Sequence, residues 1–161
     1  MLACASILHY SCRMDDLYFK NALRLLQSAD KVKARLSGEF SSIHGLSVNE
    51  FFLLMQLERV TNHRLARVEL AKRMHISAST VTRMAAPMEK LGLVARQADE
   101  RDARLAFVVL TKAGLKKVKE ARATFAKQAT YLFQDRWTED ELNHFSDLLH
   151  RLVADTPGNL T

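Results

Sequence analysis

The chain has 161 residues, 48% of them hydrophobic, and a formal net charge of +6. This length and apolar content suit a single domain with a sizeable core, and the five glycines and two prolines favour a mainly helical fold. The sequence carries no phosphate loop, nucleophile elbow or metal-ligand spacing, so it predicts neither an enzyme nor a cofactor or metal site. No apolar run approaches the length of a transmembrane helix.

The N-terminal stretch, residues 1–13, has no clear helical stripe. Its apolar part is too short for a signal peptide and lacks a basic flank. We therefore expect these residues to be either a disordered lead or an extension upstream of the native start. We also expect the protein to be cytoplasmic.

Helical periodicity begins after this stretch. Asp15 or Asp16 is expected to open a long helix that runs to about Gly38, with apolar residues at spacings of three and four. After a break, Ser47 and Glu50 form a capping box in which each side chain satisfies a free backbone N–H. The short helix that follows is apolar on nearly all sides, so we expect it to lie between two layers.

A helix-turn-helix pattern follows. A short helix from Val68 to about Met74, a turn at 75–77 and a second helix ended by Gly92 match this signature, in which the second helix enters the DNA major groove. Ser77 supplies the N-cap hydroxyl. The predicted buried stripe of the second helix is Val81, Met84, Met88 and Leu91.

The other face of the second helix carries hydroxyls and one guanidinium, the groups that bond phosphates and base edges. Serine and threonine are also good residues for a helix start, but their place beside an arginine on the second helix favours DNA contact. The predicted DNA-binding residues of this helix and its cap are Ser77, Ser79, Thr80, Thr82 and Arg83.

A charged hairpin comes next. Leu93–Gln97 and Leu105–Leu110 read as strands, the second apolar enough to be buried on both faces, and a brief strand near Arg64–Ala66 could complete the sheet. Residues 59–104 hold ten Lys or Arg against five Asp or Glu, whereas the flanking segments are nearly balanced. This concentration of positive charge is the footprint expected for phosphate binding.

The tip of the hairpin reads as a wing. Arg101 and Arg104 can reach the minor groove or its flanking phosphates, where negative potential is high. We interpret Asp99 and Asp102 as braces that orient these arginines through charge-assisted hydrogen bonds. The alternative is a solvated hairpin tip with incidental charges.

These motifs stand in a fixed order over nearly fifty residues. They are ELA, STVTR, GLVAR, DERDAR and LTKAG, at Glu69–Ala71, Ser79–Arg83, Gly92–Arg96, Asp99–Arg104 and Leu110–Gly114. The pattern resembles the winged helix-turn-helix of the MarR family of bacterial transcriptional regulators. The resemblance implies a sequence-specific DNA-binding regulator, a repressor by family-level expectation, and adds Arg96 to the DNA-binding residues.

Two further helices are predicted after the hairpin. Thr111 caps a helix from Lys112 to about Asp135, and a capping box at Thr138–Glu141 opens the last helix. One chain cannot cover all the apolar stripes, so we expect an intertwined homodimer on a palindromic operator, with half-sites roughly 34–36 Å apart. The predicted fold is thus mainly α with a small β-hairpin wing. Its dimerisation lobe is 14–45 with 112–155, and its winged helix-turn-helix lobe is 46–111.

The resemblance also implies a regulatory ligand. Members of the family commonly release DNA when a small, often aromatic, molecule enters the crevice between the two lobes. The candidate lining is apolar, although ordinary core packing is the commoner role for any one of these side chains. It consists of Leu36, Phe40, Phe51, Phe52 and Met55.

Two alternatives remain open at this point. Some relatives sense oxidants with a cysteine at the start of the first helix, and Cys12 lies near that start, although a lone cysteine in a loose N-terminus is more often inert. The other alternative is a winged-helix module that binds protein instead of DNA. Such modules usually lack the basic surplus and the arginine-bearing wing.

Overall fold

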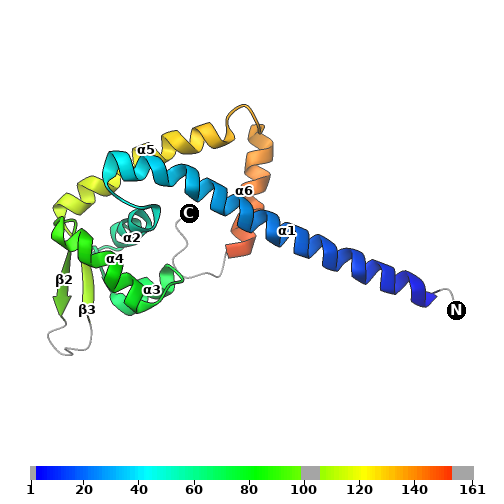
Figure 1. Cartoon of the computed structure of the whole chain (residues 1–161), viewed down its shortest axis with the longest axis horizontal. Helices are drawn as coiled ribbons and strands as arrows, with labels where there is room; N and C mark the ends of the chain where they lie inside the picture. Colours follow the sequence, from blue (N-terminus) through cyan, green and yellow to red (C-terminus); the bar gives the residue numbers. More distant parts are fainter. Residues whose placement is uncertain (1–2, 99–105, 154–161) are drawn as a thin grey trace.

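A computed structural model describes residues 3–98 and 106–153 of the chain (Figure 1). Within these residues it has six α-helices, one π-helical turn and three strands. In chain order they are α1 (Ala3–Glu39), η1 (Phe40–His44), α2 (Val48–Glu58), β1 (Arg64–Ala66), α3 (Arg67–Arg73), α4 (Ala78–Lys90), β2 (Val94–Ala98), β3 (Ala106–Leu110), α5 (Lys112–Phe133) and α6 (Glu139–Val153).

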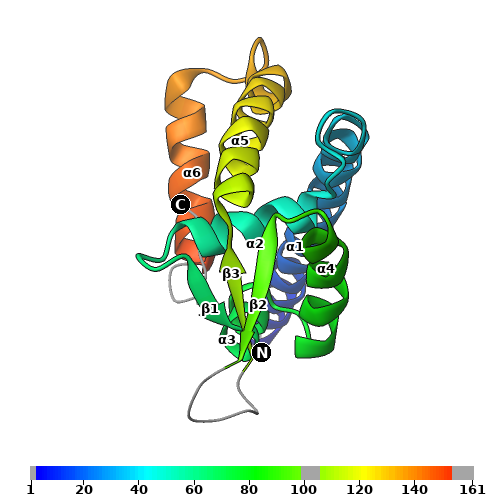
Figure 2. The ribbon, with the colours of Figure 1, turned by 90° about the vertical axis from the view of Figure 1, so that its left-hand side faces the viewer.

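The strands form one antiparallel sheet in the order β1-β3-β2 (Figure 2). β1 pairs with β3 as the third strand, which confirms the sequence expectation for residues 64–66. The expectation that the last strand is buried on both faces is wrong, because only Val108 and Leu110 are buried and their neighbours are half-exposed. One face of the sheet packs against the core. Successive side chains of β3 point to opposite faces, so every second one lies on the face that is partly exposed to solvent.

α2 lies in the centre of the core, as its all-round apolar character predicts. Phe51, Leu54 and Leu57 are almost completely buried, and the helix contacts α1, α3, α5 and β3. The predicted capping box is present: the Ser47 N–H donates to Glu50 Oε2 over 2.7 Å, and the Glu50 N–H donates to Ser47 Oγ over 3.2 Å. Burial of these side chains contributes about 1.5–3 kcal/mol each.

α3 and α4 form the predicted helix-turn-helix. α4 ends in a Schellman motif, with Gly92 at φ +71 and the Leu93 N–H bonded to the Met88 carbonyl over 2.9 Å. Its buried stripe differs from the prediction, since Ala85 is buried while Leu91 is 64% exposed. The helix ends at Lys90, and the chain turns at Leu91 and Gly92 toward β2, so the Leu91 side chain does not extend the stripe.

α1 is longer than the sequence predicted, because it begins at Ala3 and not at residue 15 or 16. Residues 3–13, for which we expected either a disordered lead or an extension upstream of the native start, lie in this helix, and the extension stays a prediction. The sequence has no glycine or proline before Gly38 to stop a helix. Figure 1 shows the N-terminal half of α1 running out beyond the rest of the chain.

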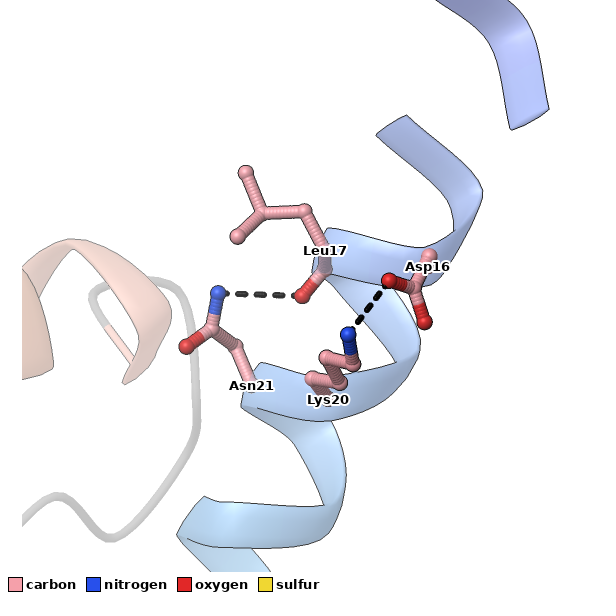
Figure 3. A network of polar contacts seen from close by, with 4 residues as sticks. All are labelled: Asp16, Leu17, Lys20 and Asn21. Atoms are coloured by element: carbon pink, nitrogen blue, oxygen red, sulfur yellow. Dashed lines mark hydrogen bonds and ion pairs between the residues drawn. The ribbon is translucent and has the colours of Figure 1, made fainter. Parts of the chain in front are cut away.

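Contacts within one turn of helix support the exposed part of α1. Lys20 pairs with Asp16 at 2.6 Å, and the Asn21 side chain donates to the Leu17 carbonyl at 3.0 Å (Figure 3). Large apolar side chains on this part are exposed to solvent: Leu17, Tyr18, Phe19, Leu23, Leu25 and Leu26.

An aromatic cluster joins the end of α1 to α2 and α5. The rings of Phe40 and Phe51 lie 5.0 Å apart, and those of Phe51 and Phe125 lie 5.7 Å apart. The chain then turns at Gly45, whose φ of +63 explains the predicted break. This cluster forms the junction between the helices from the termini and the winged lobe.

α5 and α6 begin at their predicted caps. Thr111 accepts from the Gly114 N–H at 3.0 Å, and Thr138 accepts from the Glu141 N–H at 3.3 Å. Among the residues described, none of α6 is buried. No helix in the described part of the chain is long and apolar enough to cross a membrane.

Candidate nucleic-acid interface

The N-terminal turns of α4 carry a compact group of hydroxyls. Ser77 Oγ lies 2.8 Å from both Ser79 Oγ and Thr80 Oγ1 and accepts from the Thr80 N–H at 3.1 Å. Arg83 Nη2 donates to Thr80 Oγ1 at 3.4 Å, which places the guanidinium beside the hydroxyls. We call Ser77, Ser79, Thr80 and Arg83 the hydroxyl–arginine cluster.

Three of the four cluster residues are exposed to solvent, and Thr80 is half-buried. The cluster has hydroxyls that donate or accept hydrogen bonds and a guanidinium that only donates. No acidic residue lies in the first turn of α4 to repel phosphate. Together with β2 and β3, α4 lies at the end of the molecule opposite the N-terminus of α1 (Figure 1).

Thr82 differs from the other predicted contacts. Its hydroxyl donates to the Ala78 carbonyl at 3.0 Å and accepts from Arg67 Nη1 at 3.2 Å. Both bonds are partly buried, so this side chain is held within the lobe. The sequence pattern could not separate Thr82 from Thr80, because the separation depends on Arg67 of the preceding helix.

Arg96 ties the wing sheet to α4. Its Nε lies 3.1 Å from Glu89 Oε2, and the two side chains are 48% and 39% exposed. An ion pair this exposed adds little to stability, but it fixes the direction of the guanidinium. The predicted wing residues Asp99, Arg101, Asp102 and Arg104 lie outside the described residues.

Two basic residues next to the interface were not singled out from the sequence. Arg64 lies with its guanidinium carbon 3.9 Å from the centre of the Phe107 ring, and its Nη1 donates to Gln97 Oε1 at 3.3 Å. Arg67 begins α3 and reaches Thr82. The basic surplus of this segment was the one sequence signal for both, since their partners come from distant elements.

A cavity of about 330 Å³ opens behind the helix-turn-helix. It lies between α1 and α2 on one side and the end of α3, the turn and α4 on the other. Its lining mixes apolar side chains with basic and polar ones: Lys33, Asn49, Phe52, Gln56, Arg73, Met74, His75, Ile76, Thr80 and Met84.

The cavity is not where the sequence placed the ligand pocket. Leu36, Phe40 and Phe51 are buried core residues, and Met55 is half-buried against that core. Of the predicted lining only Phe52 borders the cavity. The apolar pattern indicated where the lobes contact each other. The side chains at this contact pack tightly, so they leave no room for a ligand between them.

The basic groups around the cavity come from separate elements. Lys33 lies on α1, Arg73 ends α3, and His75 follows in a left-handed conformation with φ +53. Arg73 also pairs with Glu69 through a 2.8 Å contact to its Oε1. Thr80 borders the cavity and belongs to the hydroxyl–arginine cluster, so the two sites share a residue.

The remaining candidate groups lie elsewhere. Among the described residues, no three His, Cys, Asp or Glu side chains are grouped to hold a metal ion. Cys12 falls within α1, but its side chain lies outside what is described. His44 Nε2 lies 2.8 Å from Thr124 Oγ1, and burial, with a smaller effect of Lys117, lowers the pKa of this imidazole.

The winged lobe is also recognised by comparison with known proteins. A sequence model of the MarR family matches residues 46–105. An uncharacterized HTH-type transcriptional regulator, YwaE of Bacillus subtilis (strain 168), is 31% identical over 134 residues, which span 83% of this chain and 76% of the relative. The chain belongs to the MarR family. It is therefore a DNA-binding transcriptional regulator and not an enzyme.

Solved structures of transcriptional regulators share most of the fold. Sco3205 of Streptomyces coelicolor, solved in complex with DNA, superposes with a TM-score of 0.74 at 23% identity, over 89% of this chain and 87% of that one. The organohalide-sensing regulator RdhR-CbdbA1625, solved with 2,4-dichlorophenol bound, gives a TM-score of 0.74 at 19% identity, over 87% and 81%. At these identities the likeness establishes the fold alone.

Proposed function

We propose that this MarR-family chain represses transcription by binding a palindromic operator as a homodimer, with the hydroxyl–arginine cluster in the major groove. The observation that carries the proposal is the exposed cluster on the first turns of α4, where a recognition helix meets base edges. The wing arginines Arg101 and Arg104 remain predicted minor-groove or phosphate contacts. A dimer seated on a promoter represses by excluding the polymerase.

The exposed apolar side chains of α1 and α6 support the homodimer. Leu26 is 65% exposed, Leu152 is 63% exposed, and none of the described residues of α6 is buried. Soluble monomers seldom expose so much contiguous apolar surface. A twofold arrangement that pairs the helices from the two termini would cover it and would present two α4 helices to successive major grooves.

We further infer that a small molecule in the cavity releases the protein from DNA. The cavity touches α1 and α2 as well as the helix-turn-helix, so an occupant would contact both lobes. It would shift the population toward the lobe arrangement that it binds more tightly. The structure of RdhR-CbdbA1625 with 2,4-dichlorophenol bound supports a small aromatic ligand.

The proposal is tested by selecting duplexes from a random-sequence pool with the purified protein and sequencing them. We expect a palindrome whose half-sites are about one helical turn apart. Binding to the selected duplex should weaken steeply as salt rises, because each neutralised phosphate releases counterions. A selected pool without enriched sequence, or binding insensitive to salt, would favour the protein-binding module over the operator-binding regulator.

A further inference from the structure

Arg67 has an unusual environment for an arginine near a DNA-binding surface. It is the first residue of α3 and is half-buried. Its Nη1 donates to Thr82 Oγ1, whereas its Nε is buried and has no hydrogen-bond partner among the described residues. A buried donor without an acceptor destabilises a fold, so packing alone gives no reason for an arginine at this position.

The Thr82 hydroxyl is committed to the interior of the lobe. It has one proton, which it donates to the Ala78 carbonyl at 3.0 Å, and it therefore accepts from Arg67. Phosphate oxygens only accept hydrogen bonds, so a hydroxyl that contacts phosphate must donate. Thr82 would have to give up the Ala78 bond to do so, unlike the exposed Ser77 and Ser79.

Arg67 lies where α3, α4 and the wing sheet meet. A cavity of about 40 Å³ at this junction is bordered by Arg67, Thr82, Arg96, Phe107 and Val108, among others. Arg96 pairs with Glu89 near the end of α4, while Arg67 holds Thr82 on its second turn. Two arginines thus attach the recognition helix at two separate points to the elements beside it.

We propose that Arg67 is a positioning residue for DNA binding, which holds the second turn of α4 against the start of α3 through the Thr82 hydroxyl. Thr82 is then an internal anchor and not a DNA contact, contrary to the sequence prediction. The inference rests on the proposed function, because α4 must read the operator for its orientation to matter. Small misplacements of a recognition helix weaken several base contacts at once.

The decisive variant is the double substitution Arg67→Met with Thr82→Val. Both replacements approximate the shape of the original side chain and remove the polar partners together, which leaves stability unchanged or raised. We expect the unfolding midpoint to stay level or rise. Affinity for the duplex selected by the parent should fall about tenfold, whereas affinity for mixed-sequence duplex should change little.

Single variants separate positioning from direct contact. Arg67→Met and Thr82→Val should each lower the affinity for the selected duplex about as much as the double variant does. Each of them breaks the same hydrogen bond. Thr82→Ser keeps the hydroxyl and should restore binding. The slope of log affinity against log salt should match the parent in all variants, since a phosphate contact would lower it by about one. Arg136→Met, in the turn before α6, controls for the lost charge.

The outcomes distinguish this inference from the proposed function. If the parent selects no duplex, both are overturned. If the parent selects a palindrome and the double variant binds it equally well, the Arg67 inference alone is wrong. Additive losses in the single variants, a lowered salt slope for Arg67→Met, or a loss of affinity that merely follows a lowered unfolding midpoint would each overturn it as well.

Discussion

The winged lobe and the helices from the two termini differ in how much of their apolar surface is buried. Within the winged lobe Leu70, Val81 and Met88 are completely buried, whereas in the exposed half of α1 Phe19 is 67% and Leu26 is 65% exposed. The described residues of the first region bury their apolar side chains within one chain. The second region has an apolar face with no partner among the described residues, which is the expected appearance of one half of an interface.

The largest effect should come from the core of the single chain. Phe51 is 1% exposed and packs against Phe40 and Phe125. Phe51→Ala should lower the free energy of unfolding by about 3–5 kcal/mol, because it removes buried area and leaves a cavity. Denaturant unfolding followed by circular dichroism measures this. A loss under about 1 kcal/mol would mean that the junction between the lobes is not packed as described.

Two equally exposed leucines sharpen the comparison. Leu26 on α1 and Leu91 at the end of α4 are 65% and 64% exposed, so burial within one chain does not distinguish them. Leu26→Glu should dissociate the dimer, raising its dissociation constant at least tenfold, because a buried leucine contributes about 1.5–3 kcal/mol.

Leu91→Glu is the matched control and should leave the dimer intact. Sedimentation equilibrium of both variants gives the answer. Equal dissociation constants for the two would show that α1 does not form the interface, and the proposed palindromic operator would then need another explanation.

The interface on α4 should be important for binding and unimportant for folding. Arg83→Ala should weaken binding to the selected duplex by about 1–3 kcal/mol if the guanidinium meets a base edge, with the dimer unchanged. Fluorescence anisotropy at fixed salt measures the loss. Lys72→Ala, at an exposed position of α3, removes a charge outside the cluster and should have a smaller effect. If the Arg83→Ala variant binds the selected duplex with the affinity of the parent, the hydroxyl–arginine cluster is not the DNA contact.

The smallest effect concerns pH and the junction between the lobes. The pKa of His44 is lowered mainly by burial, so the folded state binds this proton less readily than the unfolded chain does. Stability is therefore complete above about pH 6.5 and declines as the pH falls below it. In His44→Gln this decline should be shallower. The free energy of unfolding of the parent and the variant is measured across pH 5.5–8. Parallel pH dependences would show that the His44 imidazole does not cause the decline.

The local features of the fold could be predicted from sequence because they depend on neighbouring residues. Ser47 with Glu50, Ser77, Gly92 and Thr111 each act within one turn of a helix. The position of the helix-turn-helix followed in part from these signals.

Features that depend on tertiary packing were predicted less well. The start of α1 was missed because residues 3–13 show no apolar stripe in the sequence. The predicted ligand lining stays a prediction: Leu36 and Phe40 are buried in the core and do not border the cavity, and a sequence does not distinguish side chains that line a space from those that fill it. The inward turn of Thr82 depends on Arg67, fifteen residues earlier.

The central claim is that two copies of this chain hold their α4 helices at a spacing that suits one duplex. Light scattering of the complex with the selected duplex tests it directly, because the mass gives the number of chains bound. The account predicts two chains per duplex, with the free protein already dimeric. A complex that holds one chain, formed by a protein that is monomeric in solution, would contradict it.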